Sequence, residues 1–135
     1  MERREFIQKS GVACLGIIVG GGLLSACTKV YYAQYVVEGS LIKVAKSEFS
    51  DRSAVVIRDH GLPAPIYVVK DGEVYTAVLM LCTHLGCEIT PFGQELHCPC
   101  HGSEFSNTGQ VLAGPAENPL KKFKVETKND FIIIT

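Results

Sequence analysis

The chain has 135 residues, 47% of them hydrophobic, and a formal net charge of −1. This length suits one domain of ordinary size, and the apolar fraction is enough for a hydrophobic core. The near-neutral charge gives no indication of nucleic-acid binding, and the residue order contains neither a glycine-rich phosphate loop nor a serine-histidine-aspartate arrangement. We therefore expect no nucleic-acid partner and find no independent catalytic site.

Residues 1–27 differ from the rest of the chain and have the three-part form of an export signal. A charged start is followed by the almost wholly apolar, glycine-rich run from Gly11 to Ala26. Arg3-Arg4 followed by Phe6-Ile7 resembles the twin-arginine signal, which addresses proteins that are exported already folded. The segment predicts a domain on the extracytoplasmic, periplasmic side of a bacterial cell envelope.

The attachment of the chain to the membrane has two alternatives. Leu24-Ser25-Ala26-Cys27 resembles a bacterial lipobox, which makes Cys27 the candidate for lipidation and the first residue of the mature chain. The competing interpretation is an uncleaved transmembrane anchor. The apolar run is short beside the roughly 20 residues that cross a bilayer core, which favours the lipoprotein.

Residues 28–39 are expected to form a connector. Tyr31, Tyr32 and Tyr35 distinguish this segment from the small polar tethers that allow a domain to swing freely. The alternative is that these rings simply pack on the domain, because tyrosine rings bury well.

From residue 40 onwards the pattern is that of an all-β domain. Short runs of β-branched residues alternate with turn residues, and no convincing helix follows the signal. We predict an antiparallel sandwich of two packed sheets over residues 40–135, with a smaller metal-binding unit made of loops. The expected strands are 41–44, 54–57, a hairpin of 66–69 with 74–81, 94–97, and a hairpin of 123–127 with 131–134.

The chemistry is concentrated in residues 82–105, which hold four of the six cysteines and three of the four histidines. Two short clusters stand out, and each offers one cysteine-histidine pair and one additional cysteine. They are Cys82-Thr83-His84-Leu85-Gly86-Cys87 and Cys98-Pro99-Cys100-His101-Gly102-Ser103. A thiolate and an imidazole two or three positions apart on a tight loop can converge on one metal centre, and two such loops can enclose it. His97 lies outside both clusters and is interpreted as a strand side chain.

A structural zinc site is one interpretation of this pattern, since two cysteines and two histidines form a common tetrahedral zinc site. The two-residue step from Cys82 to His84 is shorter than the usual zinc spacing, and a zinc site would leave two cysteines without a role.

The order of these residues resembles the pair of cluster-binding loops of Rieske iron–sulfur proteins. In that family two histidines replace two cysteines on one iron of a 2Fe-2S cluster. The resemblance implies that Cys82 and Cys98 hold one iron and that His84 and His101 hold the other. It also implies that Cys87 and Cys100 form a disulfide that joins the loops.

The resemblance further implies residues that tune the cluster. Ser103 stands where the family supplies a hydroxyl to a cluster sulfur, and Leu85 and Gly102 lie within the ligand loops. Quinol-oxidising members carry a tyrosine where this chain has Phe105, so we expect a lower reduction potential than theirs. Residues 114–119, which begin with Gly114-Pro115, resemble the proline loop that covers the cluster.

The implied function is one-electron transfer by a membrane-anchored subunit or carrier that passes electrons from quinol to a cytochrome. Its expected partners are a cytochrome b-type subunit and a cytochrome acceptor. The alternative is a small relay subunit of an exported molybdopterin oxidase of the arsenite oxidase type. A structural zinc module is the remote alternative.

Overall fold

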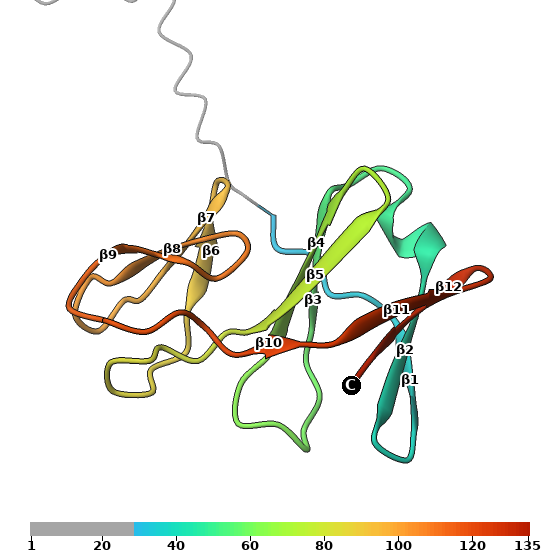
Figure 1. The fold of residues 1–135 in the computed structure, drawn as a ribbon, viewed down its shortest axis with the longest axis horizontal. Helices are drawn as coiled ribbons and strands as arrows, with labels where there is room; N and C mark the ends of the chain where they lie inside the picture. Colours follow the sequence, from blue (N-terminus) through green and yellow to red (C-terminus); the bar gives the residue numbers. More distant parts are fainter. Residues whose placement is uncertain (1–28) are drawn as a thin grey trace, which may run out of the picture.

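The computed structural model describes residues 29–135, which form twelve β-strands and one turn of 3-10 helix (Figure 1). In chain order the elements are β1 (Tyr35–Glu38), β2 (Leu41–Ala45), η1 (Lys46–Phe49), β3 (Ala54–Ile57), β4 (Ile66–Asp71), β5 (Val74–Leu79), β6 (Thr90–Phe92), β7 (Glu95–His97), β8 (Glu104–Ser106), β9 (Val111–Ala113), β10 (Lys122–Phe123), β11 (Val125–Lys128) and β12 (Phe131–Ile134). The predicted all-β fold is confirmed.

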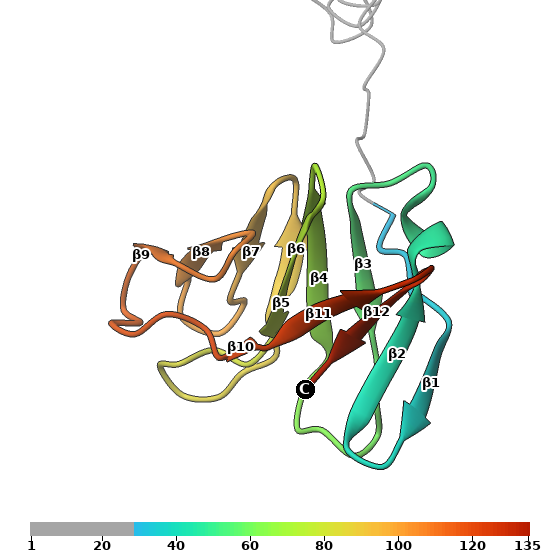
Figure 2. The same cartoon turned by 45° about the vertical axis from the view of Figure 1, so that its right-hand side comes forward.

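The strands form three four-stranded antiparallel sheets with the orders β1-β2-β12-β11, β10-β5-β4-β3 and β6-β7-β8-β9. The first two sheets pack together and form a base unit of residues 29–81 and 121–135. The third sheet belongs to a small unit of residues 82–120 at one end of the molecule (Figures 1 and 2). The central sheet, β10-β5-β4-β3, lies between the other two.

The position of the central sheet explains its sequence. One of its faces packs in a core with Ile132 and Ile134 of β12, and the other packs in a second core with Leu96 and Phe105 of the small unit. A strand covered on both sides needs apolar residues at every position. The run Ile66–Val69 in β4 is accordingly buried throughout, whereas β2 alternates between buried and partly buried residues.

The predicted strands are found close to their expected places, but the small unit is more ordered than expected. The residue pattern predicts one strand there, at 94–97, and otherwise loops. The structure adds the short strands β6, β8 and β9, which pair with β7 and with one another. This sheet holds the segment that follows the first ligand loop, at β6, and the start of the second ligand loop, at the end of β7.

Part of the expected connector, residues 28–39, lies within the base unit. β1 pairs with β2 along its whole length, and Tyr32 forms a parallel bridge to Val56 in β3. Tyr35 adds a hydrogen bond from its hydroxyl to the backbone carbonyl of Arg58 at 2.8 Å. The tyrosines of this segment therefore contact the domain.

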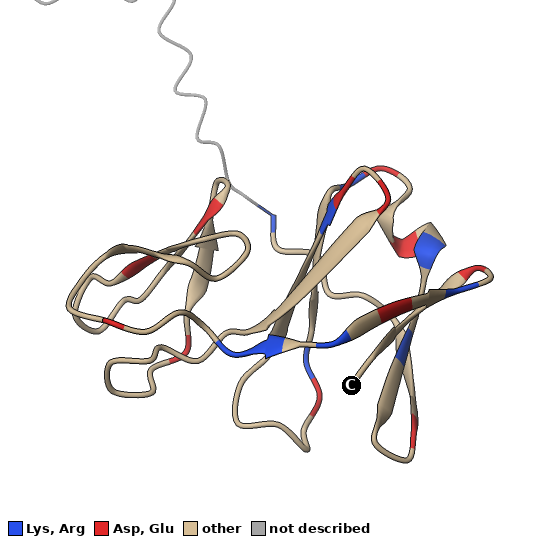
Figure 3. Ribbon diagram, viewed as in Figure 1, with Lys and Arg blue, Asp and Glu red and all other residues tan. Residues whose placement is uncertain are grey.

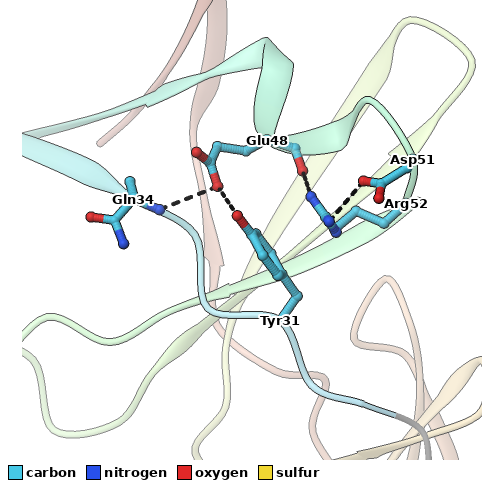
Figure 4. A network of polar contacts seen from close by, with 5 residues as sticks. All are labelled: Tyr31, Gln34, Glu48, Asp51 and Arg52. Carbon is cyan, nitrogen blue, oxygen red and sulfur yellow. Dashed lines mark hydrogen bonds and ion pairs between the residues drawn. The ribbon is translucent and has the colours of Figure 1, made fainter.

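The best defined of these contacts is the network around Glu48 (Figure 4). The Tyr31 hydroxyl donates to the Glu48 carboxylate at 2.9 Å, and the backbone N–H of Gln34 donates to the same oxygen at 3.3 Å. The Arg52 guanidinium lies 3.6 Å from the centroid of the Tyr31 ring and pairs with Asp51 at 2.7 Å.

None of the helical structure within residues 29–135 has the length and apolar character needed to cross a membrane. The proposed export signal, the lipobox and Cys27 all lie outside the described residues.

Candidate metal centre

The first ligand loop begins where β5 leads out of the base unit. The backbone N–H of Cys82 donates to the carbonyl of Cys87 at 2.8 Å, and the N–H of Gly86 donates to the carbonyl of Cys82 at 2.9 Å. Gly86 has a φ of +78°, in the left-handed region that favours glycine. The loop is thus a closed turn that holds Cys82 buried and lets the intervening side chains project outwards.

The second ligand loop repeats this closure at the end of β7. The N–H of Cys98 donates to the carbonyl of Ser103 at 2.8 Å, and the N–H of Gly102 donates to the carbonyl of Cys98 at 3.1 Å. Gly102 also has a φ of +78°. In both loops a glycine four positions after a cysteine closes the turn, which gives a structural reason for the two glycines in the motif.

The two loops bring the four predicted ligands to one end of the small unit. Cys82 and Cys98 are the free thiols among residues 29–135, and both are buried. His84 and His101 are exposed, with ring centroids 5.0 Å apart and planes nearly perpendicular. The arrangement places sulfur donors inside the unit and imidazole donors at its surface.

A disulfide joins the loops, as the resemblance implied. Cys87 and Cys100 are bonded, with their Cα atoms 6.5 Å apart. The Sγ atom of Cys98 lies within 4.8 Å of both disulfide sulfurs. The bond therefore fixes the separation of the loops directly beside a predicted ligand.

The segment from Gly114 to Pro119 is hydrogen-bonded to both ligand loops. The hydroxyl of Thr83 in the first loop donates to the carbonyl of Asn118 at 2.6 Å. The hydroxyl oxygen of Ser103 in the second loop accepts from the backbone N–H of Ala116 at 3.0 Å. The predicted proline loop is therefore held against the ligand loops from two sides.

The remaining predicted residues divide between surface and core. Leu85 is 67% exposed, next to His84. Phe105 is fully buried and pairs across the sheet with Leu96. Gly114-Pro115 is exposed at the start of the proline loop.

An ion pair that residue order does not reveal ties the small unit to the base unit near the first loop. The Arg58 guanidinium pairs with the carboxylate of Glu88 at 2.6 Å. Glu88 directly follows Cys87, so this pair supports the first loop next to the disulfide. The two residues are 30 positions apart, and only the fold shows that they meet.

Comparison with known protein families decides the identity of this centre. The Rieske [2Fe-2S] domain model matches residues 28–124. The chain belongs to the Rieske family. A Rieske-type 2Fe-2S cluster is therefore its cofactor, which replaces the zinc alternative.

Similar proteins support this assignment. The cytochrome b6-f complex iron-sulfur subunits of Chlorobaculum thiosulfatiphilum and Chlorobaculum tepidum are 32% and 31% identical to this chain. In each case the similarity covers 99% of this chain and 75% of the relative. Among solved structures, the plasma membrane Rieske protein PetC3 from Synechocystis PCC 6803 is 27% identical with a TM-score of 0.57. That match covers 67% of this chain and 94% of PetC3.

The residues present at the centre fit a Rieske cluster. Such a cluster takes two thiolates on one iron and two imidazoles on the other. The structure offers two buried free thiols and two exposed imidazoles on matched loops, with the other two cysteines of the region already bonded to each other. Each loop carries one cysteine and one histidine. Each loop can therefore contribute one ligand to each iron.

Proposed function

We propose that this Rieske protein is a membrane-anchored electron-transfer subunit or carrier that takes electrons from quinol and passes them to a cytochrome. Cys82 and Cys98 would hold one iron, and His84 and His101 the other. The bound cluster would accept and store one electron. The observation that carries the proposal is the exposed pair of imidazoles, 5.0 Å apart, at the end of disulfide-linked loops.

The side chains at this end suit a quinol. Imidazole nitrogens can accept a hydrogen bond and a proton from a quinol hydroxyl. The exposed Leu85 beside His84 offers apolar contact to the quinol ring. The relatives are named as subunits of the cytochrome b6-f complex, which makes a cytochrome b-type subunit and a cytochrome acceptor the expected partners of this chain.

The attachment and location form part of the same proposal. The export-signal pattern of residues 1–27 and the lipobox-like Cys27 support a lipid anchor, with a transmembrane anchor as the alternative. A periplasmic location suits the Cys87–Cys100 disulfide, because disulfides persist in oxidising compartments.

Phe105 favours a second candidate function. Its buried ring cannot donate the hydrogen bond that the tyrosine of quinol-oxidising members donates to a ligand sulfur. A lower potential suits a relay subunit of an exported molybdopterin oxidase of the arsenite oxidase type. A gene for a molybdopterin subunit beside this one would favour that role, and a cytochrome b gene would favour the first.

The test is anaerobic reduction of the oxidised full-length protein by a short-chain quinol. The rate is measured from the loss of the visible absorbance of the cluster. We expect reduction by quinol but not by the same compound with both hydroxyls methylated. Leu85→Ala should slow reduction, whereas Val74→Ala should not, although Val74 is equally exposed at 66% and lies on the base unit. Equal rates for the two variants, or no reduction by quinol, would contradict the proposal.

A further inference from the structure

The ion pair between Arg58 and Glu88 brings a cation of the base unit to the small unit. Residues 82–120 contain four glutamates and no lysine or arginine, and Figure 3 accordingly shows acidic positions and no basic ones there. Arg58 directly follows β3 in the base unit. Its Nη2 and Nη1 atoms donate to the two carboxylate oxygens of Glu88, at 2.6 and 3.4 Å. A contact at two points fixes the direction of both side chains as well as their distance.

Glu88 lies at the neck of the first ligand loop, where the two ends of the loop meet. Leu81 and Glu88 form an isolated antiparallel bridge. Next to it, the backbone N–H of Ile89 donates to the carbonyl of Met80 at 2.9 Å. The loop that carries His84 projects from this neck. The ion pair therefore acts on the base of the loop and leaves its exposed tip uncovered.

The connector contacts Arg58 from the base unit. The Tyr35 hydroxyl donates to the backbone carbonyl of Arg58 at 2.8 Å. The guanidinium carbon lies 6.0 Å from the centroid of the Tyr32 ring, which is within the usual reach of a cation–π contact. Two backbone hydrogen bonds of Val56, at 2.8 and 2.9 Å, keep this part of the connector on β3. Arg58 therefore joins the connector to the neck of the first ligand loop.

The second ligand loop has no matching contact. Within residues 29–135, no ion pair or side-chain hydrogen bond joins residues 98–103 to the base unit. The Ser103 hydroxyl instead accepts from Ala116, which belongs to the small unit. A change in the connector can thus reach one ligand loop through a defined contact and leave the other unaffected.

We propose that Arg58 is a positioning residue for the first ligand loop, and that it couples the connector to the position of His84. The docked connector keeps the guanidinium in place, and the guanidinium keeps Glu88 and the neck in place. Displacement of the connector from Arg58 loosens the first loop but not the second. The inference deepens the proposed function and rests on it, because His84 is a ligand only in that proposal.

The exposure of the pair determines the size of the effect. The side chains of Arg58 and Glu88 are 45% and 48% exposed, so solvent screens their attraction. Loss of such a pair changes local opening of the neck and leaves the overall fold intact. Amide hydrogen exchange reports local opening, and its rate rises in proportion to the open fraction.

The experiment measures hydrogen exchange of the oxidised full-length protein by mass spectrometry, on peptides that cover each ligand loop. Arg58→Gln and Glu88→Gln should each speed exchange of the first loop about threefold and leave the second loop unchanged. Arg58→Gln/Glu88→Gln keeps the net charge and should show the same increase as either single variant. The matched control, Glu126→Gln, breaks another exposed 2.6 Å ion pair, with Lys124, and should exchange as wild type.

Two further variants test the ion pair and the coupling. Arg58→Glu/Glu88→Arg restores the pair with its ends exchanged and should return exchange of the first loop to near the wild-type rate. Tyr32→Leu should speed this exchange about twofold, but should add nothing when combined with Arg58→Gln. A reversed pair that exchanges as fast as Arg58→Gln would overturn the role of the pair. Additive effects of Tyr32→Leu and Arg58→Gln would overturn the coupling.

Electron paramagnetic resonance of the dithionite-reduced protein tests the position of His84. A ligand loop that occupies a range of positions spreads the signal of a histidine-ligated cluster. Arg58→Gln/Glu88→Gln should therefore give a broader signal than both wild type and Glu126→Gln. A signal of unchanged width, or wild-type exchange in this double variant, would overturn the positioning role.

Failure of this inference differs from failure of the proposed function. If Arg58→Gln leaves the first loop unchanged while quinol still reduces the cluster, only the positioning role is wrong. If quinol does not reduce the wild-type cluster, the proposed function fails whatever the exchange of the first loop.

Discussion

The hydroxyl oxygen of Ser103 accepts a hydrogen bond from the backbone N–H of Ala116 at 3.0 Å, which joins the second ligand loop to the proline loop. Ser103 is fully buried, although serine is usually exposed. With its oxygen accepting from Ala116, the hydroxyl hydrogen remains available to donate towards the cluster. One side chain thus anchors the covering loop, and we predict that it also tunes the centre.

We expect Ser103→Ala to lower the reduction potential of the cluster. A hydrogen bond to a charged group contributes about 1.5 kcal/mol, equivalent to roughly 60 mV for one electron. A spectroscopic redox titration measures the change. Ser106→Ala is the control, because the Ser106 hydroxyl accepts instead from the backbone N–H groups of Thr108 and Gln110 in a neighbouring turn. Equal potentials for Ser103→Ala and wild type would exclude the tuning role.

Phe105→Tyr should raise the reduction potential of the cluster. Phe105 lies in the same core as Cys82 and Cys98, and a tyrosine there would place a hydroxyl in that core. We expect a rise in potential of roughly 60 mV if the hydroxyl donates to a ligand sulfur. Phe105→Met, which adds no donor, should leave the potential near the wild-type value. A fall in potential on introducing tyrosine would contradict this account.

Removal of the disulfide should destabilise the small unit. The bond joins residues 13 positions apart. A disulfide that closes a loop of about this length stabilises the folded protein by roughly 3 kcal/mol, because it restricts the unfolded chain. We expect Cys87→Ser/Cys100→Ser to lower the free energy of unfolding by about this amount. Denaturation in guanidinium chloride, followed by far-ultraviolet circular dichroism and by cluster absorbance, checks both stability and cluster retention. An unchanged midpoint by both probes would show that the loops hold their separation without the bond.

Alkaline pH should weaken the fold through Tyr67. Burial raises the pKa of Tyr67 above its ordinary value of 10.0, because the charged phenolate would lose its hydration. The folded protein therefore keeps the phenolic proton at pH values where the unfolded chain releases it. The stabilising contribution is complete below about pH 10 and is lost as the pH rises further.

The free energy of unfolding, measured by chemical denaturation at several pH values above about 9, should fall more steeply for wild type than for Tyr67→Phe. The difference in slope can reach about 1.4 kcal/mol per pH unit, the value for one proton. Parallel slopes for the two proteins would contradict a raised pKa of Tyr67.

Most of the base unit could be predicted from the sequence because its strands are mostly longer than those of the small unit. Their apolar residues also form clear runs or alternating patterns. Ile66–Val69 and Ile132–Ile134 are apolar runs bounded by turns, and each is a strand in the structure. The strands β6 and β8 were missed because each has three residues, and Pro91 or the polar neighbours of Phe105 interrupt the apolar pattern. Their pairing with β7, rather than local preference, makes them strands.

The centre was predictable only in part. The two motifs identify Cys82, His84, Cys98 and His101 because ligands on one short loop are close in sequence. The Thr83–Asn118 hydrogen bond joins residues 35 positions apart, and the Arg58–Glu88 ion pair joins residues 30 positions apart. Such contacts depend on register and tertiary packing, which residue order alone does not determine.

The most direct test of the central claim is electron paramagnetic resonance of the dithionite-reduced full-length protein, together with two histidine variants. We expect wild type and His97→Gln to give the signal of a histidine-ligated 2Fe-2S cluster, and His101→Gln to lose it. His97 and His101 are four positions apart, but only His101 lies with His84 at the exposed end of the ligand loops. A wild-type protein without this signal, or a His101→Gln variant that retains it unchanged, would contradict the proposed ligand set.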